Sequence, residues 1–171
     1  MSDAAFEVVI HTDGACEKNP GPGGWAAVLA SGAHRKVISG GYRRTTNNRM
    51  ELRAVIESLA SLKGDGRRVK VVSDSRYVTD AVNKRWLSNW VRVGFRKTDG
   101  IRENADLWIE LQALIQRHSV KFEWIRGHNA HAENEECDLL AVAARRGKDL
   151  LVDSAFEDPA ASHAALGLTL V

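Results

Sequence analysis

The order of strand-like and helical segments constrains the fold of this chain more than any other feature. Five apolar segments rich in β-branched residues are expected to be strands: 6–12, 25–30, 35–42, 68–73 and 120–126. Apolar residues at helical spacing predict helices at about 50–62, 76–91 (with a possible break), 107–115 and 133–146. Short turns join the first three strands into an antiparallel meander, whereas helical connections require parallel pairing. The sequence therefore predicts an α/β fold, a five-stranded mixed sheet with helices on both faces.

The length of 171 residues indicates one folded domain, which we place at residues 1–147. Residues 148–171 have no clear hydrophobic period. After Lys148 they contain four acidic residues and neither Lys nor Arg: Asp149, Asp153, Glu157 and Asp158. We expect this part of the chain to be an acidic, partly ordered tail.

Neither membrane insertion nor secretion is expected for this chain. No apolar run approaches the roughly 20 residues of a membrane-spanning helix, and residues 1–7 lack the basic and then apolar pattern of a secretion signal. The two cysteines, Cys16 and Cys137, have no metal-ligand spacing and are expected to be free thiols. A cytoplasmic monomer is the resulting expectation.

Four carboxylates stand where strand ends and helix faces are expected to converge. Asp13 and Asp74 each follow an apolar strand, and they meet at one edge of the sheet if these two strands are parallel neighbours. Glu51 shares a helical face with Val55, so it points toward the sheet, where an unpaired carboxylate would be costly. Asp138 also leans toward the body of the protein from its own helix.

Acids that converge without a matching set of bases indicate a bound cation. Oxygen ligands suit Mg²⁺ or Mn²⁺, whereas Zn²⁺ usually recruits His or Cys. Two such ions about 4 Å apart can activate a water and stabilise the leaving oxygen in phosphodiester hydrolysis. Each acid also has an ordinary interpretation: a helix cap for Asp74, a first-turn residue for Glu51 and surface acids for the others. For any one acid taken alone, the ordinary interpretation is favoured over a metal site. That all four acids have only ordinary roles, on these particular elements, is not favoured.

Two histidines lie on the loop between the fifth strand and the last helix, in the run Gly-His-Asn-Ala-His at 127–131. Imidazole is suited to proton transfer beside a metal site, because its unperturbed pKa is near neutral. We favour this role for His128. His131 is better interpreted as a helix-start or packing residue.

Positive charge is concentrated in residues 82–104, which we call the basic handle. This segment contains six basic and two acidic residues and carries +4, so that the remainder of a chain with net charge +2 carries −2. Two interpretations remain open at this point. The handle is either a local docking surface for a polyanion or a solvated helical surface.

Four segments resemble the type 1 ribonuclease H family closely. They are 12–25 (TDGACEKNPGPGGW), 46–52 (TNNRMEL), 73–78 (SDSRYV) and 127–138 (GHNAHAENEECD). The resemblance runs from about residue 6 to residue 146, in the family's order and near its spacing. It implies a ribonuclease H catalytic domain at 1–147 that hydrolyses RNA paired to DNA with two Mg²⁺ ions, for which Mn²⁺ can substitute, and leaves 5′-phosphate and 3′-hydroxyl ends.

By motif position, the resemblance implies a role for each of the acids and for one histidine. Asp13, Glu51, Asp74 and Asp138 resemble the metal ligands, and His128 the mobile proton-transfer residue that aids product release. Residues matching the family's contacts with the RNA/DNA hybrid are Cys16, Asn19, Thr46, Asn47, Asn48, Arg76, Lys84, Arg85 and Trp86. Short amide and hydroxyl side chains suit recognition of the sugars and the backbone, because the 2′-OH distinguishes RNA from DNA. The same side chains also suit turns and helix caps.

The basic handle matches the protruding helix and loop of the family. Trp86 is the expected contact there, because tryptophan beside cations suits sugar stacking and phosphate binding. Trp90 and Phe95 are better interpreted as a small helical core. Trp108 and Trp124 are expected in the main core. Thr46 resembles part of a pocket for a phosphate of the DNA strand.

Three positions depart from the family pattern. Arg76 stands where many relatives carry glutamine, which favours a phosphate contact over a base-edge or sugar contact. Ala130 stands where glycine is common and is expected to stiffen the His128 loop. The loop at 98–104 is shorter and more acidic than in well-known bacterial members, which is expected to weaken the handle's hold on the hybrid.

Three other interpretations compete with this one. A nuclease of related fold, such as an integrase or a structure-specific DNA nuclease, shares the acids but not the asparagine pair together with the handle. A hybrid-binding module without activity usually lacks a metal ligand, and all four are present here. A purely structural protein leaves the acids unexplained.

Overall fold

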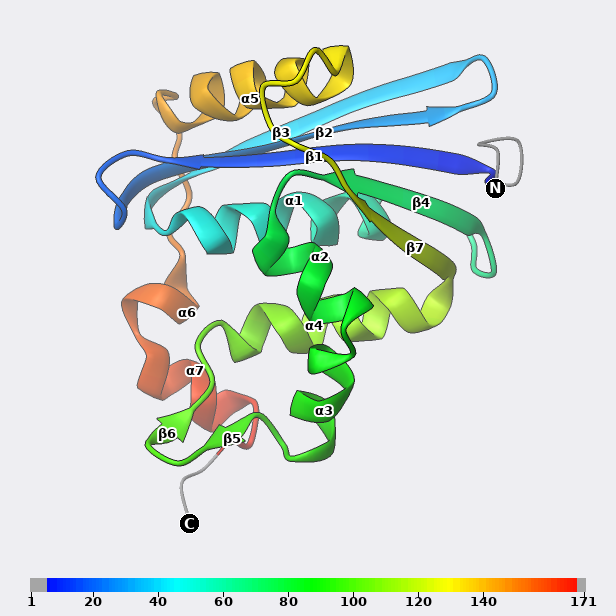
Figure 1. The fold of residues 1–171 in the computed structure, drawn as a ribbon. Coiled ribbons are helices and arrows are strands. Elements are labelled where there is room, and N and C mark those ends of the chain that lie inside the picture. The colour runs from blue at the N-terminus through cyan, green and yellow to red at the C-terminus, as the bar shows by residue number, and fades with distance from the viewer. Residues whose placement is uncertain (1–5, 169–171) are drawn as a thin grey trace.

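The protein, described by a computed structural model over residues 6–168, is built on one five-stranded mixed sheet (Figure 1). Its strands are β1 (Val8–Cys16), β2 (Gly21–Ser31), β3 (His34–Thr45), β4 (Arg68–Ser73) and β7 (Ser119–Trp124). They lie in the order β3-β2-β1-β4-β7, with β1, β2 and β3 antiparallel and β1, β4 and β7 parallel. The predicted mixed sheet and its antiparallel meander are confirmed.

Helices cover both faces of the sheet, as predicted (Figure 1). The helices are α1 (Asn47–Ala60), α2 (Arg76–Asn83), α3 (Trp86–Arg92), α4 (Ala105–Arg117), α5 (Ala132–Arg145), α6 (Ser154–Glu157) and α7 (Pro159–Ala165). Helix α5 packs on one face, and α1 packs on the other with α4 behind it. The main core lies between the sheet, α1 and α4 and includes the fully buried Trp108, as predicted.

Several element boundaries differ from the prediction. Strand β1 continues to Cys16 because its antiparallel pairing with β2 extends that far, so Asp13 lies within the strand and not after it. Helix α1 begins at Asn47, earlier than the expected start near residue 50, and ends at Ala60 with Ser61 as its C-cap. A small hairpin of β5 (Arg96–Lys97) and β6 (Gly100–Ile101) was not expected, since two-residue strands leave no hydrophobic period in the sequence.

Residues 148–168, here called the C-terminal segment, attach to the sheet by backbone pairing. The backbone of Leu151 pairs with β3, where its N–H donates to Gly41 O at 3.0 Å and its O accepts from Arg43 N at 2.8 Å. Helices α6 and α7 follow, and Asp153 is buried. Backbone pairing and a buried carboxylate leave no hydrophobic period, so sequence periodicity could not report this attachment. Residues 169–171 lie outside the described part of the chain.

No helix within residues 6–168 combines the length and apolar character needed to cross a bilayer.

Candidate active site

Three of the predicted acids meet at one edge of the sheet. Asp13 comes from β1, Glu51 from the first turns of α1, and Asp74 from the residue after β4. One carboxylate oxygen from each lies within 4.8 Å of the other two. The parallel register of β1 and β4 pairs Thr12 with Ser73. Asp13 and Asp74, the residues that follow this pair, therefore lie side by side.

Gly14 permits the close approach of α1 that brings Glu51 to Asp13. A Cβ atom at position 14 would lie 2.5 Å from the backbone nitrogen of Glu51 and 2.6 Å from the carbonyl carbon of Met50. The backbone N–H of Gly14 also donates to Asp13 Oδ1 at 2.8 Å. Strand β1 therefore orients the Asp13 carboxylate and leaves room for the helix that supplies Glu51.

The Asp74 side is held by residues from β7 and the loop after it. The indole N–H of Trp124 donates to the backbone oxygen of Asp74 at 2.9 Å, and a Cβ at Gly127 would lie 2.5 Å from Asp74 Oδ2. The Arg76 guanidinium stacks 3.7 Å from the centre of the Trp124 ring. The prediction that Trp124 is a core residue was wrong: β7 is an edge strand, and the half-buried ring supports Asp74 instead.

The cluster is electrostatically unfavourable without a cation. Burial and then the neighbouring Asp74 raise the pKa of Asp13 to about 7. Burial and then Asp13 raise the pKa of Glu51 well above its usual value. Glu51 Oε2 is buried and finds no hydrogen-bond partner among the described residues. An unpaired oxygen beside two further carboxylates fits a divalent ion held by oxygen ligands.

Asp138 lies next to this cluster but outside its tight group. It is half-buried on α5, and its charge contributes to the raised pKa of Asp13. Its oxygens are not among those within 4.8 Å of one another. The structure thus brings three of the four predicted ligands into direct proximity and places the fourth within electrostatic range.

The loop between β7 and α5 carries the two histidines. His128 is exposed and has a φ of 56°, and Ala130 has a φ of 57°. Both therefore occupy the left-handed region, which favours glycine. His128 follows Gly127, whose backbone lies against the Asp74 carboxylate. His131 precedes the first turn of α5 without a side-chain capping bond, so its predicted role as a helix-start residue holds for its position only.

The short polar side chains predicted to contact the hybrid lie at the junction of the β1–β2 loop and α1. Asn19 Oδ1 accepts from the backbone N–H of Asn47 at 2.9 Å. Thr46 caps α1 by accepting from Arg49 N at 3.3 Å, which confirms the predicted cap. The Cys16 thiol donates to a backbone oxygen of the same junction, Thr45 O, at 3.3 Å. Asn48, at the first turn of α1, is exposed.

The basic handle projects beyond α4, on the side of the molecule away from α5 (Figure 1). Trp86 is 42% exposed there, and Lys84 Nζ lies 5.2 Å from the centre of its ring. Arg85 is exposed as well. The predicted core role of Phe95 is confirmed by its 4% exposure, and Trp90 packs edge-on against Trp108 with ring centres 5.2 Å apart.

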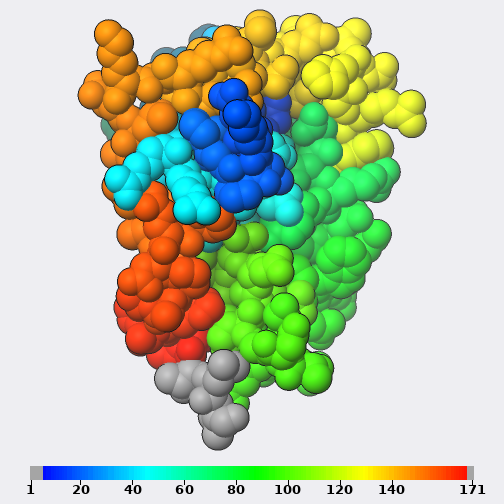
Figure 2. All heavy atoms as spheres, turned by 90° about the vertical axis from the view of Figure 1, so that its left-hand side faces the viewer, coloured from blue at the N-terminus to red at the C-terminus, as the bar shows by residue number. Residues whose placement is uncertain are grey.

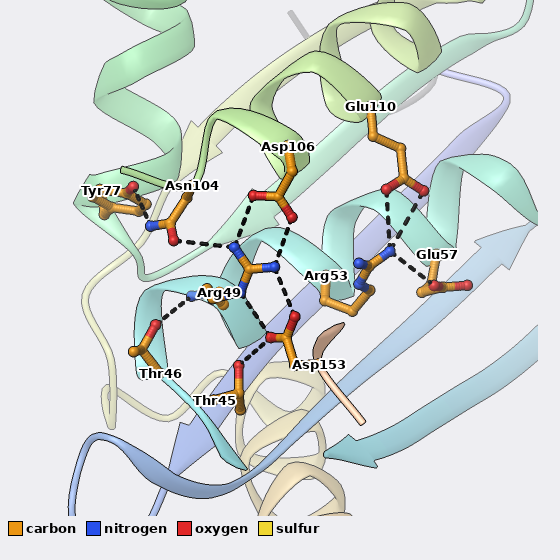
Figure 3. A network of polar contacts seen from close by, with 10 residues as sticks. All are labelled: Thr45, Thr46, Arg49, Arg53, Glu57, Tyr77, Asn104, Asp106, Glu110 and Asp153. Atoms are coloured by element: carbon orange, nitrogen blue, oxygen red, sulfur yellow. Dashed lines mark hydrogen bonds and ion pairs between the residues drawn. The ribbon is translucent and has the colours of Figure 1, made fainter. Parts of the chain in front are cut away.

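Sequence reasoning missed a buried arginine beside the site. Arg49, in the first turn of α1, forms ion pairs with Asp106 of α4 and Asp153 of the C-terminal segment, each at 2.7 Å (Figure 3). Asp153 is 104 residues away along the chain, and neither hydropathy nor motif spacing connects two residues at that separation.

The matching family model and two related sequences are those of ribonuclease H proteins. The family described as RNase H matches residues 5–146. The Ribonuclease H of Nitratidesulfovibrio vulgaris strain DP4 is 50% identical over 145 residues, which cover 83% of this chain and 92% of that protein. The Ribonuclease H of Pseudoalteromonas atlantica strain T6c is 47% identical over 151 residues, which cover 88% of this chain and 97% of that protein.

Solved structures share the fold. LC9-RNase H1, described as a type 1 RNase H with the type 2 active-site motif, is 34% identical with a TM-score of 0.74, covering 96% of this chain and 86% of its own. The N-terminal RNase H domain of a Mycobacterium tuberculosis protein is 26% identical with a TM-score of 0.63, covering 91% and 99%. LC11-RNase H1, solved with an RNA/DNA hybrid, is 22% identical with a TM-score of 0.61, covering 87% and 99%; this last likeness shows the fold alone.

Proposed function

The chain belongs to the ribonuclease H family and is a nuclease acting on RNA in RNA/DNA hybrids, and we propose that Asp13, Glu51 and Asp74 hold its divalent metal ions. Asp138 completes the ligand set from α5 when the ions and the substrate are present. The observation that carries this assignment is the group of three carboxylates within 4.8 Å of one another, one of which has a buried oxygen without a partner. The all-oxygen ligand set supports two Mg²⁺ ions, with Mn²⁺ as a substitute.

The chemistry that such ions supply is activation of a water and stabilisation of the leaving oxygen, which gives 5′-phosphate and 3′-hydroxyl ends. The chain's own task is to fix the acids. Gly14 lets α1 approach β1, and Gly127 and Trp124 hold Asp74 against the β7 loop. This rigid support reduces the reorganisation that binding of the ions requires.

His128 is proposed to move a proton at the edge of the site and to aid product release. Its exposure on a loop that touches Asp74 supports this role, because a proton-transfer residue has to reach both the reacting groups and solvent.

The hybrid is proposed to lie across the α1 junction and the basic handle. Cys16, Asn19, Asn47 and Asn48 would contact sugars and backbone, with the 2′-OH groups marking the RNA strand. Thr46 would contribute to a phosphate site for the DNA strand. Its hydroxyl oxygen accepts a helix N–H, and its hydroxyl hydrogen can still donate to a phosphate oxygen.

Further contacts are proposed on either side of this junction. Arg76 stacks on Trp124 through the face of its guanidinium, which leaves its N–H edge for a phosphate. Lys84, Arg85 and Trp86 begin the handle, where an exposed indole lies beside a cation.

A cytoplasmic monomer is the proposed working form. The free thiols Cys16 and Cys137 support a reducing compartment. All the proposed ligands and substrate contacts come from one chain, so the site needs no second subunit. Sedimentation at assay concentrations would check the monomer.

Cleavage of a uniform RNA/DNA hybrid, compared with matched RNA and DNA duplexes, tests the proposed function. We expect cleavage of the RNA strand of the hybrid alone, and only with Mg²⁺ or Mn²⁺ added. Equal cleavage of the DNA duplex would contradict the hybrid specificity, and full activity in a chelator would contradict the metal site.

A further inference from the structure

We propose that Asp153, from the C-terminal segment, is a positioning residue that holds residues 46–48 in their substrate-binding arrangement. This inference rests on the proposed function, in which Thr46, Asn47 and Asn48 contact the hybrid. Asp153 forms no hydrogen bond with these three side chains; it bonds to the residues on either side of them, Thr45 and Arg49.

The carboxylate of Asp153 binds Arg49, the residue that follows residues 46–48. Arg49 Nε and Nη2 donate to the two oxygens of Asp153 at 2.7 and 2.8 Å. Nη1 and Nη2 also donate to Asp106 at 2.9 and 2.7 Å, and Nη1 to Asn104 Oδ1 at 3.3 Å. All five N–H donors of Arg49 are therefore engaged, and its side chain is 3% exposed (Figure 3).

The same carboxylate also binds Thr45, the residue that precedes residues 46–48. Thr45 Oγ1 donates to Asp153 Oδ2 at 2.7 Å. Asp153 therefore ties the end of β3 to the first turn of α1, at positions 45 and 49, and residues 46–48 span the gap between two fixed points. Charge-assisted bonds of this kind, with the Asp153 side chain 5% exposed, restrict both ends of a short segment more strongly than solvated contacts do.

The surroundings of Asp153 place the C-terminal segment beside the proposed substrate contacts. A cavity of about 410 Å³ has Asn19, Thr46 and Asn48 among its lining residues, together with Ala155 and Phe156 of the C-terminal segment. Figure 2 shows the α6–α7 region, in orange-red, directly below the α1 start in cyan and the β1–β2 loop in blue. The segment that Asp153 anchors thus borders the surface on which the hybrid is proposed to lie.

A neutral substitution can weaken the Asp153 link and leave the rest of the network in place. In Asp153→Asn, the amide nitrogen cannot accept from Arg49, so one of the two hydrogen bonds is lost. The other is weakened, because its acceptor no longer carries a negative charge. Arg49 keeps its bidentate pair with Asp106, which still attaches α1 to α4. The change therefore acts on the tether of residues 45–49 and does not leave a buried charge without a partner.

The test is steady-state kinetics of Asp153→Asn in the full chain, well below the melting temperature of every variant. We expect KM for the hybrid, and Kd in Ca²⁺, to rise by about 5–20-fold with kcat changed less than about twofold, because a binding surface is disturbed and the acids are not. The matched control, Glu157→Gln, removes an exposed ion pair of the same C-terminal segment with Arg43. Its KM, Kd and kcat should stay within about twofold of wild type.

The outcomes separate this inference from the proposed function. If wild type does not cut the hybrid, the proposed function fails and this inference fails with it. If wild type cuts and Asp153→Asn has the KM and Kd of the control, or loses kcat at unchanged KM, only the positioning role is overturned. Should Asp153→Asn not fold, Thr45→Val removes the hydroxyl link alone. A KM raised about 2–5-fold supports the inference, and an unchanged KM overturns it.

Discussion

Crowded carboxylates govern the chemistry at the scale of single residues. Asp13 and Glu51 are buried next to each other and to Asp74, and burial of an acid disfavours its charged form. Without a cation the pKa of Asp13 rises to about 7, so near neutral pH the folded protein binds a proton that the unfolded chain releases. Folding and the proposed metal binding are therefore expected to be linked through the same side chains.

Asp13→Asn is expected to abolish nearly all cleavage and to stabilise the metal-free protein. The folded pKa of Asp13 is raised from 3.8 to about 7, so wild type loses stability as the pH rises through this window, and asparagine does not. We expect no gain at pH 3, and at pH 8 a gain on the order of 1–2 kcal/mol, or about 2–8 °C in Tm.

Circular dichroism melts at the two pH values, with and without Mg²⁺, would measure these effects. Mg²⁺ should raise the Tm of wild type and have little effect on the variant. A gain at pH 3 equal to that at pH 8 would contradict the assigned linkage, and near-normal turnover of Asp13→Asn in Mg²⁺ would contradict the catalytic role.

His128→Ala is expected to slow turnover by roughly 10–100-fold with the hybrid still bound, as for the loss of a general acid–base group. The exposed position of His128 predicts little change in Tm. The matched control is His131→Ala, three residues along the same loop. If the His131 variant were the slower of the two, the roles of the histidines would be reversed.

Among the secondary-structure elements, α1 and the basic handle have different proposed roles, in catalysis and in binding of the hybrid. Helix α1 carries Glu51 into the acidic cluster and begins with residues that are proposed to contact the hybrid. The handle, residues 82–104, contains α3 and the β5–β6 hairpin and contributes charge and an exposed indole. Because these elements are separate, binding by the handle and catalysis at the acids can be changed independently.

Replacing Lys84, Arg85 and Arg92 with alanine is expected to raise KM more than it lowers kcat, because uniform binding is lost while the metal site is untouched. The log–log salt dependence should flatten by roughly 0.7–0.9 per phosphate contact removed. Lys84 already pairs with Asp80 at 2.9 Å, so Arg85→Ala should account for more of the change than Lys84→Ala.

Binding to the hybrid in Ca²⁺ across a salt series would check the handle's role. The charge-neutral control is Ser88→Ala on the exposed side of α3. An unchanged Kd and salt slope in the triple variant would mean that the handle is only a solvated surface.

Elements with a strong hydrophobic period were predictable from the sequence, and those held by other forces were not. Strand β4 matched its expected range, because its apolar run is buried and bounded by polar turns. The extension of β1 past Asp13 depends on pairing with β2, which the sequence of β1 alone does not contain. Motif spacing placed Asp13, Glu51 and Asp74, but not Trp124, whose role follows from the edge position of β7.

At the scale of the whole molecule, the C-terminal segment closes the structure onto α1 and β3. Asp153 and Asp106 enclose Arg49, and neither ion pair could be predicted from the sequence, since their partners are 104 and 57 residues from Arg49. An isolated aspartate in an acidic segment reads as a solvated residue. Only the three-dimensional packing of α1 against α4 and residue 153 shows that it is buried.

Arg49→Ala is expected to destabilise the fold by roughly 3–5 kcal/mol, because removal of one partner leaves buried charges uncompensated. The matched control, Arg53→Ala one turn along α1, removes ion pairs with the more exposed Glu57 and Glu110 and should cost less than about 1 kcal/mol per pair. Urea titration of both variants would measure the difference. Equal losses would contradict the view that the Arg49 network joins the C-terminal segment to the domain.

The proposed divalent-metal site of Asp13, Glu51 and Asp74 should cleave the RNA strand of a hybrid only while all three carboxylates are present. The most direct measurement is single-turnover cleavage of a uniform RNA/DNA hybrid by wild type and Asp74→Asn across a Mg²⁺ titration. We predict Mg²⁺-dependent cleavage by wild type, with 5′-phosphate and 3′-hydroxyl ends, and loss of nearly all cleavage in the variant while its Kd for the hybrid in Ca²⁺ stays close to that of wild type. Cleavage by Asp74→Asn at the wild-type rate and Mg²⁺ midpoint would mean that Asp74 does not hold a catalytic metal ion.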